Sequence, residues 1–257
     1  MPFLRRPDGC RLYYETFGHR RTEPLVLLEG RGGDVAGWRR NIPRLSRELW
    51  VVAYDFRGNG RSDPPQPGAT MASFIDDTVA LLDHLELASA HVYGQSFGGM
   101  VAQELALAHP DRVRSLILAA THCGGGVAIR SRPHVSKDRP WLQLYSDRFA
   151  REHPDHVRED MDVARMNPQS SEAARRQGAA MQGFDVCDRL GEIRAPTLVL
   201  HGTEDRMVDP RNAAILAERI PRAELVWLHS AGHLYHSEQP GAADRAVIAF
   251  VKRHADG

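Results

Sequence analysis

Residues 92–100 read Val-Tyr-Gly-Gln-Ser-Phe-Gly-Gly-Met, and this stretch is the most informative part of the sequence. The residues before the turn, 90–93, include β-branched and aromatic side chains, which are typical of a buried strand. Residues 101–108 carry a helix-forming pattern that starts directly after the turn. The stretch therefore predicts a buried strand that passes through a sharp Gly-x-Ser-x-Gly turn into a helix.

The two outer glycines of this turn are expected for steric reasons. A strand that turns at once into a helix has no space for Cβ atoms beside its apical residue, and Gly94 and Gly98 provide that space. The hydroxyl of Ser96 would then project from the top of the sheet, beside the first amide of a helix, that of Phe97. Helix N-termini favour an anion. The turn alone is weak evidence, because its spacing also arises by chance.

Length and composition limit the class of protein. A chain of 257 residues fits one sizeable domain. Lys+Arg and Asp+Glu both number 33, so we expect neither a nucleic acid nor a membrane as a partner. The N-terminus lacks the apolar core of a signal peptide, which predicts a cytoplasmic protein, and the strong preference for arginine over lysine suggests a bacterial source. Three widely spaced cysteines predict reduced thiols.

Apolar runs alternate with amphipathic segments along most of the chain. An N-terminal hairpin is expected over residues 2–17, and buried strands over 24–28, 50–54, 90–93, 113–120, 195–200 and 223–228. Helices are expected over 38–49, 74–85, 101–108, 211–219 and 242–253. Unbroken apolar strands that alternate with helices predict an α/β fold, with a mostly parallel sheet and helices on both faces.

One region departs from this alternation. Residues 127–188 are polar, carry apolar residues at helical spacing, and contain no strong strand pattern. We interpret them as a small helical cap insertion in a core domain formed by residues 1–126 and 189–257.

Polar, glycine-rich loops follow several of the expected strands, as active sites of open α/β sheets require. With its motifs at 94–99, 55–62, 202–208 and 232–240, the chain resembles the α/β-hydrolase fold superfamily of the serine-nucleophile type. Small esterases, enol-lactonases and cofactor-free haloperoxidase-like members are the nearest in pattern. The resemblance covers nearly everything outside the insertion.

A serine hydroxyl needs a base to take its proton, and the base needs an acid to fix its tautomer. The resemblance implies Ser96 as nucleophile, His233 as general base and Asp205 as the orienting acid. It also implies an oxyanion hole formed by the backbone N–H groups of Arg31 and Phe97.

Glu29 departs from the family pattern, since most relatives carry His-Gly where this chain has Glu29-Gly30. A carboxylate beside a developing oxyanion would oppose it unless the charge is paired or points away. One interpretation is a salt bridge from Glu29 to an arginine, with Arg31, Arg57 and Arg61 as the candidates. The other is that Glu29 or Arg31 faces the substrate and that the chemistry is not simple ester hydrolysis.

The remaining candidates are residues that would line the substrate pocket. Besides Glu29 they are Gly30, Gln95, Cys123, Trp141 and Tyr145. A buried thiol such as Cys123 more often serves packing than catalysis. Trp141 and Tyr145 belong to an apolar face of the insertion that either covers the site or packs onto the sheet.

The sequence thus predicts a hydrolase of a small ester or lactone that forms an acyl intermediate on Ser96. It needs no cofactor and no metal, and its partner is a small-molecule substrate. Two alternatives stay open: a non-hydrolytic cyclase, lyase or tailoring enzyme that uses Glu29, and a ligand receptor that keeps the three residues. The oligomeric state is also open, with a homodimer as one option.

Overall fold

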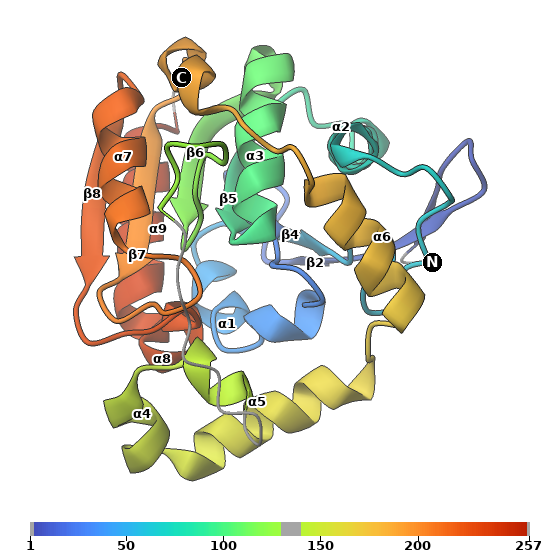
Figure 1. The fold of residues 1–257 in the computed structure, drawn as a ribbon. Helices are drawn as coiled ribbons and strands as arrows, with labels where there is room; N and C mark the ends of the chain where they lie inside the picture. Colours follow the sequence, from blue (N-terminus) through green and yellow to red (C-terminus); the bar gives the residue numbers. More distant parts are fainter. Residues whose placement is uncertain (1–2, 130–139, 256–257) are drawn as a thin grey trace.

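A central eight-stranded sheet organises the computed structural model, which describes residues 3–129 and 140–255 (Figure 1). Its strands are β1 (Phe3–Arg5), β2 (Arg11–Phe17), β3 (Pro24–Leu28), β4 (Trp50–Tyr54), β5 (Ala90–Gln95), β6 (Val113–Ala119), β7 (Thr197–Gly202) and β8 (Ala223–Leu228). They lie in the order β1-β2-β4-β3-β5-β6-β7-β8. Only the pairs β1–β2 and β2–β4 are antiparallel, so the predicted mostly parallel sheet is confirmed.

Helices cover both faces of this sheet. They are α1 (Ile42–Leu45), α2 (Met71–His84), α3 (Phe97–Ala108), α4 (Asp147–Glu152), α5 (Pro154–Met166), α6 (Ser171–Met181), α7 (Arg211–Arg219), α8 (Tyr235–Glu238) and α9 (Pro240–Arg253). Short 3-10 helices are η1 (Val35–Trp38), η2 (Pro110–Arg112), η3 (Pro140–Leu144) and η4 (Cys187–Glu192). The buried residues of α2, α3 and α7 belong to one apolar cluster, and those of α1, α8 and α9 to the other.

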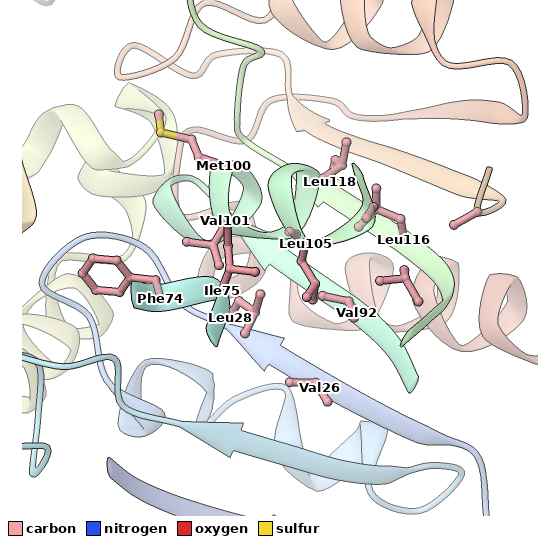
Figure 2. Packing of buried hydrophobic residues seen from close by; sticks show 14 of the residues in the cluster. Val26, Leu28, Phe74, Ile75, Val92, Met100, Val101, Leu105, Leu116 and Leu118 are labelled. Carbon is pink, nitrogen blue, oxygen red and sulfur yellow. The ribbon is translucent and has the colours of Figure 1, made fainter. Parts of the chain in front are cut away.

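Successive residues of the central strands enter these two clusters alternately, as the period of two requires. On β3, Val26 and Leu28 join α2 and α3, whereas Leu25 and Leu27 face α1 and α9. Figure 2 shows the first of these clusters, in which the side chains of β3, β5 and β6 meet those of α2 and α3. Both faces of the central strands β3, β4 and β5 are therefore buried, which explains their largely apolar sequence, whereas the edge strand β8 is only partly buried.

The insertion helices α4, α5 and α6 lie outside the two layers. In Figure 1 they follow one another around the end of the sheet toward which β8 points, and α5 packs against η1. The part of the predicted insertion that the structure describes is thus helical, and it sits at the edge where the parallel strands end. Within the described residues, no helix has the length and apolar character needed to cross a membrane.

One expected helix, over residues 38–49, does not form. The structure replaces it with η1, which ends at Trp38, and the four-residue α1. Pro43 has no N–H to donate to the carbonyl of Arg39, and its ring would clash with that carbonyl in a continuous helix. The proline therefore explains the interruption.

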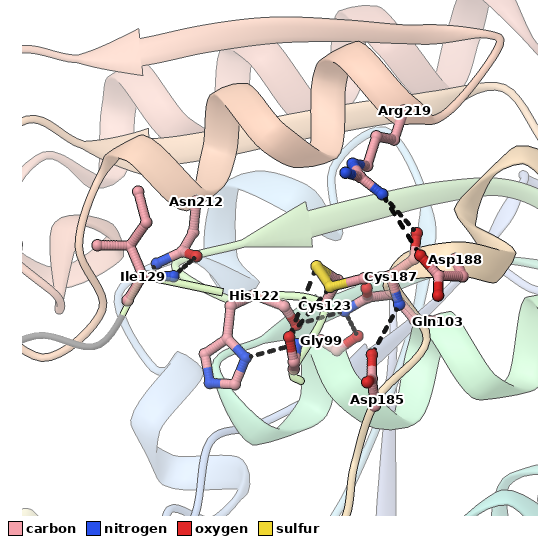
Figure 3. Close-up of a disulfide and its surroundings, with 11 residues drawn as sticks. Gly99, Gln103, His122, Cys123, Ile129, Asp185, Cys187, Asp188, Asn212 and Arg219 are labelled. Atoms are coloured by element: carbon pink, nitrogen blue, oxygen red, sulfur yellow. Dashed lines mark hydrogen bonds and ion pairs between the residues drawn. A yellow bond between two sulfur atoms is a disulfide. The ribbon is translucent and has the colours of Figure 1, made fainter. Parts of the chain in front are cut away.

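The prediction of reduced thiols is wrong for two of the three cysteines. Cys123, just beyond β6, forms a disulfide with Cys187 at the start of η4, and only Cys10 is free (Figure 3). The bond joins residues 64 apart in sequence, and it ties together the two chain segments that flank the insertion helices. Disulfides are typical of oxidising compartments, so this one does not support the cytoplasmic location expected from the N-terminal sequence.

We expect this bond to make a measurable contribution to stability. Closing a loop of 64 residues lowers the entropy of the unfolded chain, which corresponds to about 4 kcal/mol. Reduction, or the variant Cys187→Ser, should therefore lower the melting temperature by about 10 °C. The check is a thermal melt with and without a phosphine reductant, together with a thiol titration of the denatured protein.

A Cys10→Ser variant provides the control, because Cys10 takes no part in the bond and the variant should keep the full response to reductant. A titration that finds three thiols before reduction would contradict the pairing.

Candidate active site

Ser96 occupies a strained turn between β5 and α3. Its backbone has φ 53° and ψ −114°, in a region that residues with a Cβ rarely adopt. A Cβ on Gly94 would collide with the carbonyl of Gly98, and one on Gly98 would collide with that of Leu28. Two hydrogen bonds tie the backbone of this turn to β6 and the loop after it. The N–H of Ser96 donates to the Ala119 carbonyl (2.9 Å), and Thr121 Oγ1 donates to the Ser96 carbonyl (2.8 Å).

Asp205 and His233 form a buried hydrogen-bonded pair at the ends of β7 and β8. His233 Nδ1 lies 2.8 Å from Asp205 Oδ2. The other carboxylate oxygen, Oδ1, accepts the backbone N–H groups of Met207 (2.8 Å) and Val208 (2.9 Å). Burial acts to raise the pKa of Asp205, but the adjacent His233 and His201 outweigh it and lower that pKa. Asp205 is therefore ionised at neutral pH and accepts the Nδ1 proton of His233, which leaves Nε2 as the basic nitrogen.

A cavity of about 510 Å³ brings the predicted residues together. Ser96 and His233 both line it, as do Gly30 and Gln95. A Cβ on Gly30 would stand 2.6 Å from Gln95 Oε1, so the Gln95 side chain would have to move to accommodate it. In the residues that the structure describes, Ser96 Oγ and His233 share no hydrogen bond. Contacts of this kind often tighten only when substrate is bound.

Two backbone N–H groups on the cavity wall were predicted as donors to an oxyanion. Arg31 and Phe97, the predicted pair, both line the cavity. Their N–H groups have no acceptor within the described part of the chain. By contrast, the N–H of Gly30 is bound by the Glu29 carboxylate, Oε1, at 2.8 Å. The N–H groups of Arg31 and Phe97 therefore remain available to a ligand.

Glu29 is buried beside these donors without an ion pair. None of the arginines considered from sequence bonds it: Arg57 pairs with Asp77 and Asp8, and Arg61 pairs with Glu15. The expected salt bridge is therefore absent from the described residues. The carboxyl occupies space left by Gly33 and Gly37, and its Oε2 has no hydrogen-bond partner there. Burial raises the pKa of Glu29 to about 7, helped by Asp34 and opposed by the Gly30 N–H and His233.

This raised pKa predicts a specific pH dependence of stability. The unfolded chain releases the Glu29 proton near pH 4.5 and the folded protein near pH 7, so the folded state loses stability as the pH rises between these values. In Glu29→Gln that loss is absent. The unfolding free energy of the variant relative to wild type should therefore rise by about 2 to 3 kcal/mol between pH 5 and 8.

Urea denaturation at several pH values measures this difference. Glu218→Gln is the matched control, because Glu218 is exposed on α7 and its replacement should give a pH-independent difference. A pH-independent difference for Glu29→Gln as well would show that the carboxyl ionises normally in the folded protein.

The other three candidate pocket residues do not line this cavity. Cys123 is held in its disulfide. Tyr145 is fully buried, and its hydroxyl donates to Asp160 Oδ2 (2.9 Å). Trp141 lines a separate hollow of about 610 Å³ that the insertion helices form. The predicted helical spacing placed Trp141 and Tyr145 on one face. The structure instead has a short 3-10 helix, η3, that ends at Leu144, and the two side chains lie in different environments.

The comparisons with known proteins agree with this architecture. A sequence profile of the alpha/beta hydrolase fold matches residues 23–161, which is more than half of the chain. The chain belongs to the α/β-hydrolase fold family. It is similar to a putative carbamate hydrolase, RutD, of Caulobacter vibrioides, with 31% identity over 95% of this chain and 96% of that protein. The 3-oxoadipate enol-lactonase 2 of Acinetobacter baylyi is 30% identical over 94% of this chain and 93% of that protein.

A solved structure leads to the same conclusion about the fold. The crystal structure of a hydrolase from Pseudomonas aeruginosa PA01 superposes with a TM-score of 0.86 and 30% identity, and the match covers 97% of each chain. Together with the named relatives, this shows that the protein is an enzyme of the α/β-hydrolase class.

Two residues of this hydrolase's site were missed from sequence. His201 on β7 is fully buried and its Nε2 lies 3.1 Å from Asp205 Oδ2, so Asp205 faces two imidazoles. Asp160 on α5 lines the cavity and binds Arg39, Arg40 and Ser237 of the main body. The spacing of four between His201 and Asp205 was a usable signal for the first, whereas no signal in the sequence marks Asp160.

Proposed function

We propose that this hydrolase cleaves a small ester or lactone through an acyl intermediate on Ser96. The observation that carries the proposal is the Asp205–His233 hydrogen bond, 2.8 Å long, at the edge of the cavity into which the strained Ser96 turn opens. An ionised, buried carboxylate on Nδ1 leaves Nε2 free to take a proton. The relatives named as an enol-lactonase and a carbamate hydrolase support a substrate with an acyl carbon.

The reaction has two halves. In the first, His233 Nε2 takes the proton of Ser96 Oγ while Oγ attacks the carbonyl carbon, and the resulting oxyanion accepts the N–H groups of Arg31 and Phe97. The bond to the leaving oxygen then breaks, and His233 gives that oxygen its proton. In the second half, His233 takes a proton from water, the hydroxide attacks the acyl carbon, and Ser96 leaves with the proton restored.

The test combines a covalent probe with a substrate panel. A fluorophosphonate should add one equivalent to the folded protein by intact mass, and a panel of p-nitrophenyl esters, lactones and thioesters should include substrates with steady turnover. The proposal fails if the folded wild-type protein neither reacts with the probe nor hydrolyses any member of the panel.

Glu29 favours a second candidate, a non-hydrolytic reaction such as a lyase or cyclase step. Its buried, unpaired carboxyl has a pKa of about 7, which suits proton transfer near neutral pH. Loss of activity in folded Glu29→Gln would support this candidate. A variant that hydrolyses the panel as fast as wild type would count against it.

A further inference from the structure

The cavity around Ser96 has an unequal distribution of charge. Three of its residues are acidic, and they differ in the partners that offset their charge. Asp160 is bound by Arg39 and Arg40. Asp34 accepts hydrogen bonds from the Asn167 amide (3.0 Å) and the Ala36 N–H (3.0 Å). Burial raises the pKa of Glu29 to about 7, so this carboxyl is partly protonated at neutral pH.

The basic groups on the cavity wall also differ in whether they are charged and whether an acid pairs with that charge. Arg39 is paired with Asp160. Burial lowers the pKa of His122, and it lowers that of His236 to about 4, so both imidazoles are neutral at pH 7. Arg31 alone among these side chains carries a full charge with no acid within 4.0 Å in the described residues. Among the described residues, Arg31 is therefore the arginine of the cavity wall whose guanidinium is not paired with an acid.

Arg31 links the loop beside Ser96 to the insertion helices. The residue follows Gly30 in the loop that supplies the proposed oxyanion donor, and its side chain is exposed. Its Nη1 reaches toward α6, where it stands 3.8 Å from the position of a Cβ on Gly178. The guanidinium thus extends from the oxyanion loop toward the insertion helices.

The rest of the wall is mainly apolar, with methionine and aliphatic side chains from α3, α5, α6 and the loop after β7. They include Met100, Met161, Val163, Met181 and Val208. An apolar wall with one unpaired guanidinium fits a ligand that combines a short hydrocarbon chain with one anionic group. A planar guanidinium prefers a carboxylate, which it binds through two parallel hydrogen bonds.

We propose that the guanidinium of Arg31 binds a carboxylate of the substrate, so that the preferred substrates are esters or lactones whose acyl part also carries a carboxylate. This inference rests on the proposed function, because it assigns the substrate class of the same cavity. Arg31 is then a specificity-determining residue through its side chain, separately from its backbone N–H.

A matched pair of esters tests the inference. Mono-p-nitrophenyl glutarate carries a terminal carboxylate, and p-nitrophenyl pentanoate replaces that group with a methyl. We expect wild type to favour the glutarate in kcat/KM by roughly tenfold or more. Arg31→Gln should bring the ratio of the two kcat/KM values close to one, and Arg31→Glu should invert it. The ratio is informative because both esters use the same oxyanion donors, so any effect on those donors cancels.

Arg47→Gln is the matched control, because Arg47 is an exposed arginine that does not line the cavity, and it should keep the wild-type ratio. A wild-type ratio near one, or an unchanged ratio in Arg31→Gln, would overturn the inference while ester turnover left the proposed function standing. If the folded wild-type protein hydrolysed neither ester nor any lactone, the proposed function would fall and the inference with it.

Discussion

Replacing Ser96 with alanine is expected to lower kcat on any ester or lactone that the wild-type protein hydrolyses by roughly 10⁵- to 10⁶-fold. Without the hydroxyl no acyl intermediate can form, and the slow residual reaction would come from the oxyanion donors acting on water. The fold should survive, because the bonds that hold the turn use the backbone N–H and carbonyl of Ser96 rather than its hydroxyl. The measurement is steady-state hydrolysis, with circular dichroism to check folding.

Ser230→Ala is the matched control for this variant. Ser230 also has a positive φ, 57°, but it is exposed in the loop after β8 and does not line the cavity. Its replacement should leave kcat within about twofold, as for surface changes of no more than 0.5 kcal/mol. If Ser96→Ala kept more than about a hundredth of wild-type turnover, the serine would not be the nucleophile, since a nucleophile costs far more than that.

The strands and most helices could be predicted because their signals are local. The strands β3, β4 and β8 match their predicted residue ranges. Boundaries were less certain where several residues compete to cap a helix. At α2 the N-cap is Thr70, and Ser73 at the third helical position returns a bond to the Thr70 N–H (3.2 Å). Thr70 and Ser73 both carry a hydroxyl that could cap the helix, and only the backbone conformation identifies Thr70 as the N-cap.

In the candidate site, too, features with a local sequence signal could be predicted and contacts between distant residues could not. Ser96, Asp205 and His233 each follow a recognisable strand, so the sequence could place all three at one sheet edge. Pairings across the fold had no such signal. The disulfide joins residues 64 apart, and the direction of the Tyr145 side chain depends on a partner, Asp160, on a different helix. Within the described residues Glu29 lacks an ion pair because Arg57 and Arg61 bind other acids and the Arg31 side chain extends toward α6, which no sequence spacing reveals.

The second large effect concerns Asp205, whose replacement by asparagine should lower kcat by about 10⁴-fold. If the amide oxygen keeps the N–H groups of Met207 and Val208, the amide NH₂ faces His233 Nδ1 and His201 Nε2. Nδ1 must then accept a hydrogen bond, so the proton of His233 moves to Nε2. An Nε2 that carries a proton cannot take one from Ser96.

Asp209→Asn separates this effect from a general loss of negative charge, because Asp209 lies in the same loop and its carboxylate binds Arg211. That variant should retain near wild-type kcat. The free energy of unfolding provides a second readout. Because the pKa of Asp205 is lowered in the folded protein, its ionised carboxylate stabilises the fold at neutral pH, and this contribution is lost only as the solution becomes acidic. Asp205→Asn should therefore be less stable than wild type at pH 7, and the difference should shrink on acidification. An Asp205→Asn protein with normal kcat would show that His233 does not depend on this carboxylate, and Glu204 would become the acid to test.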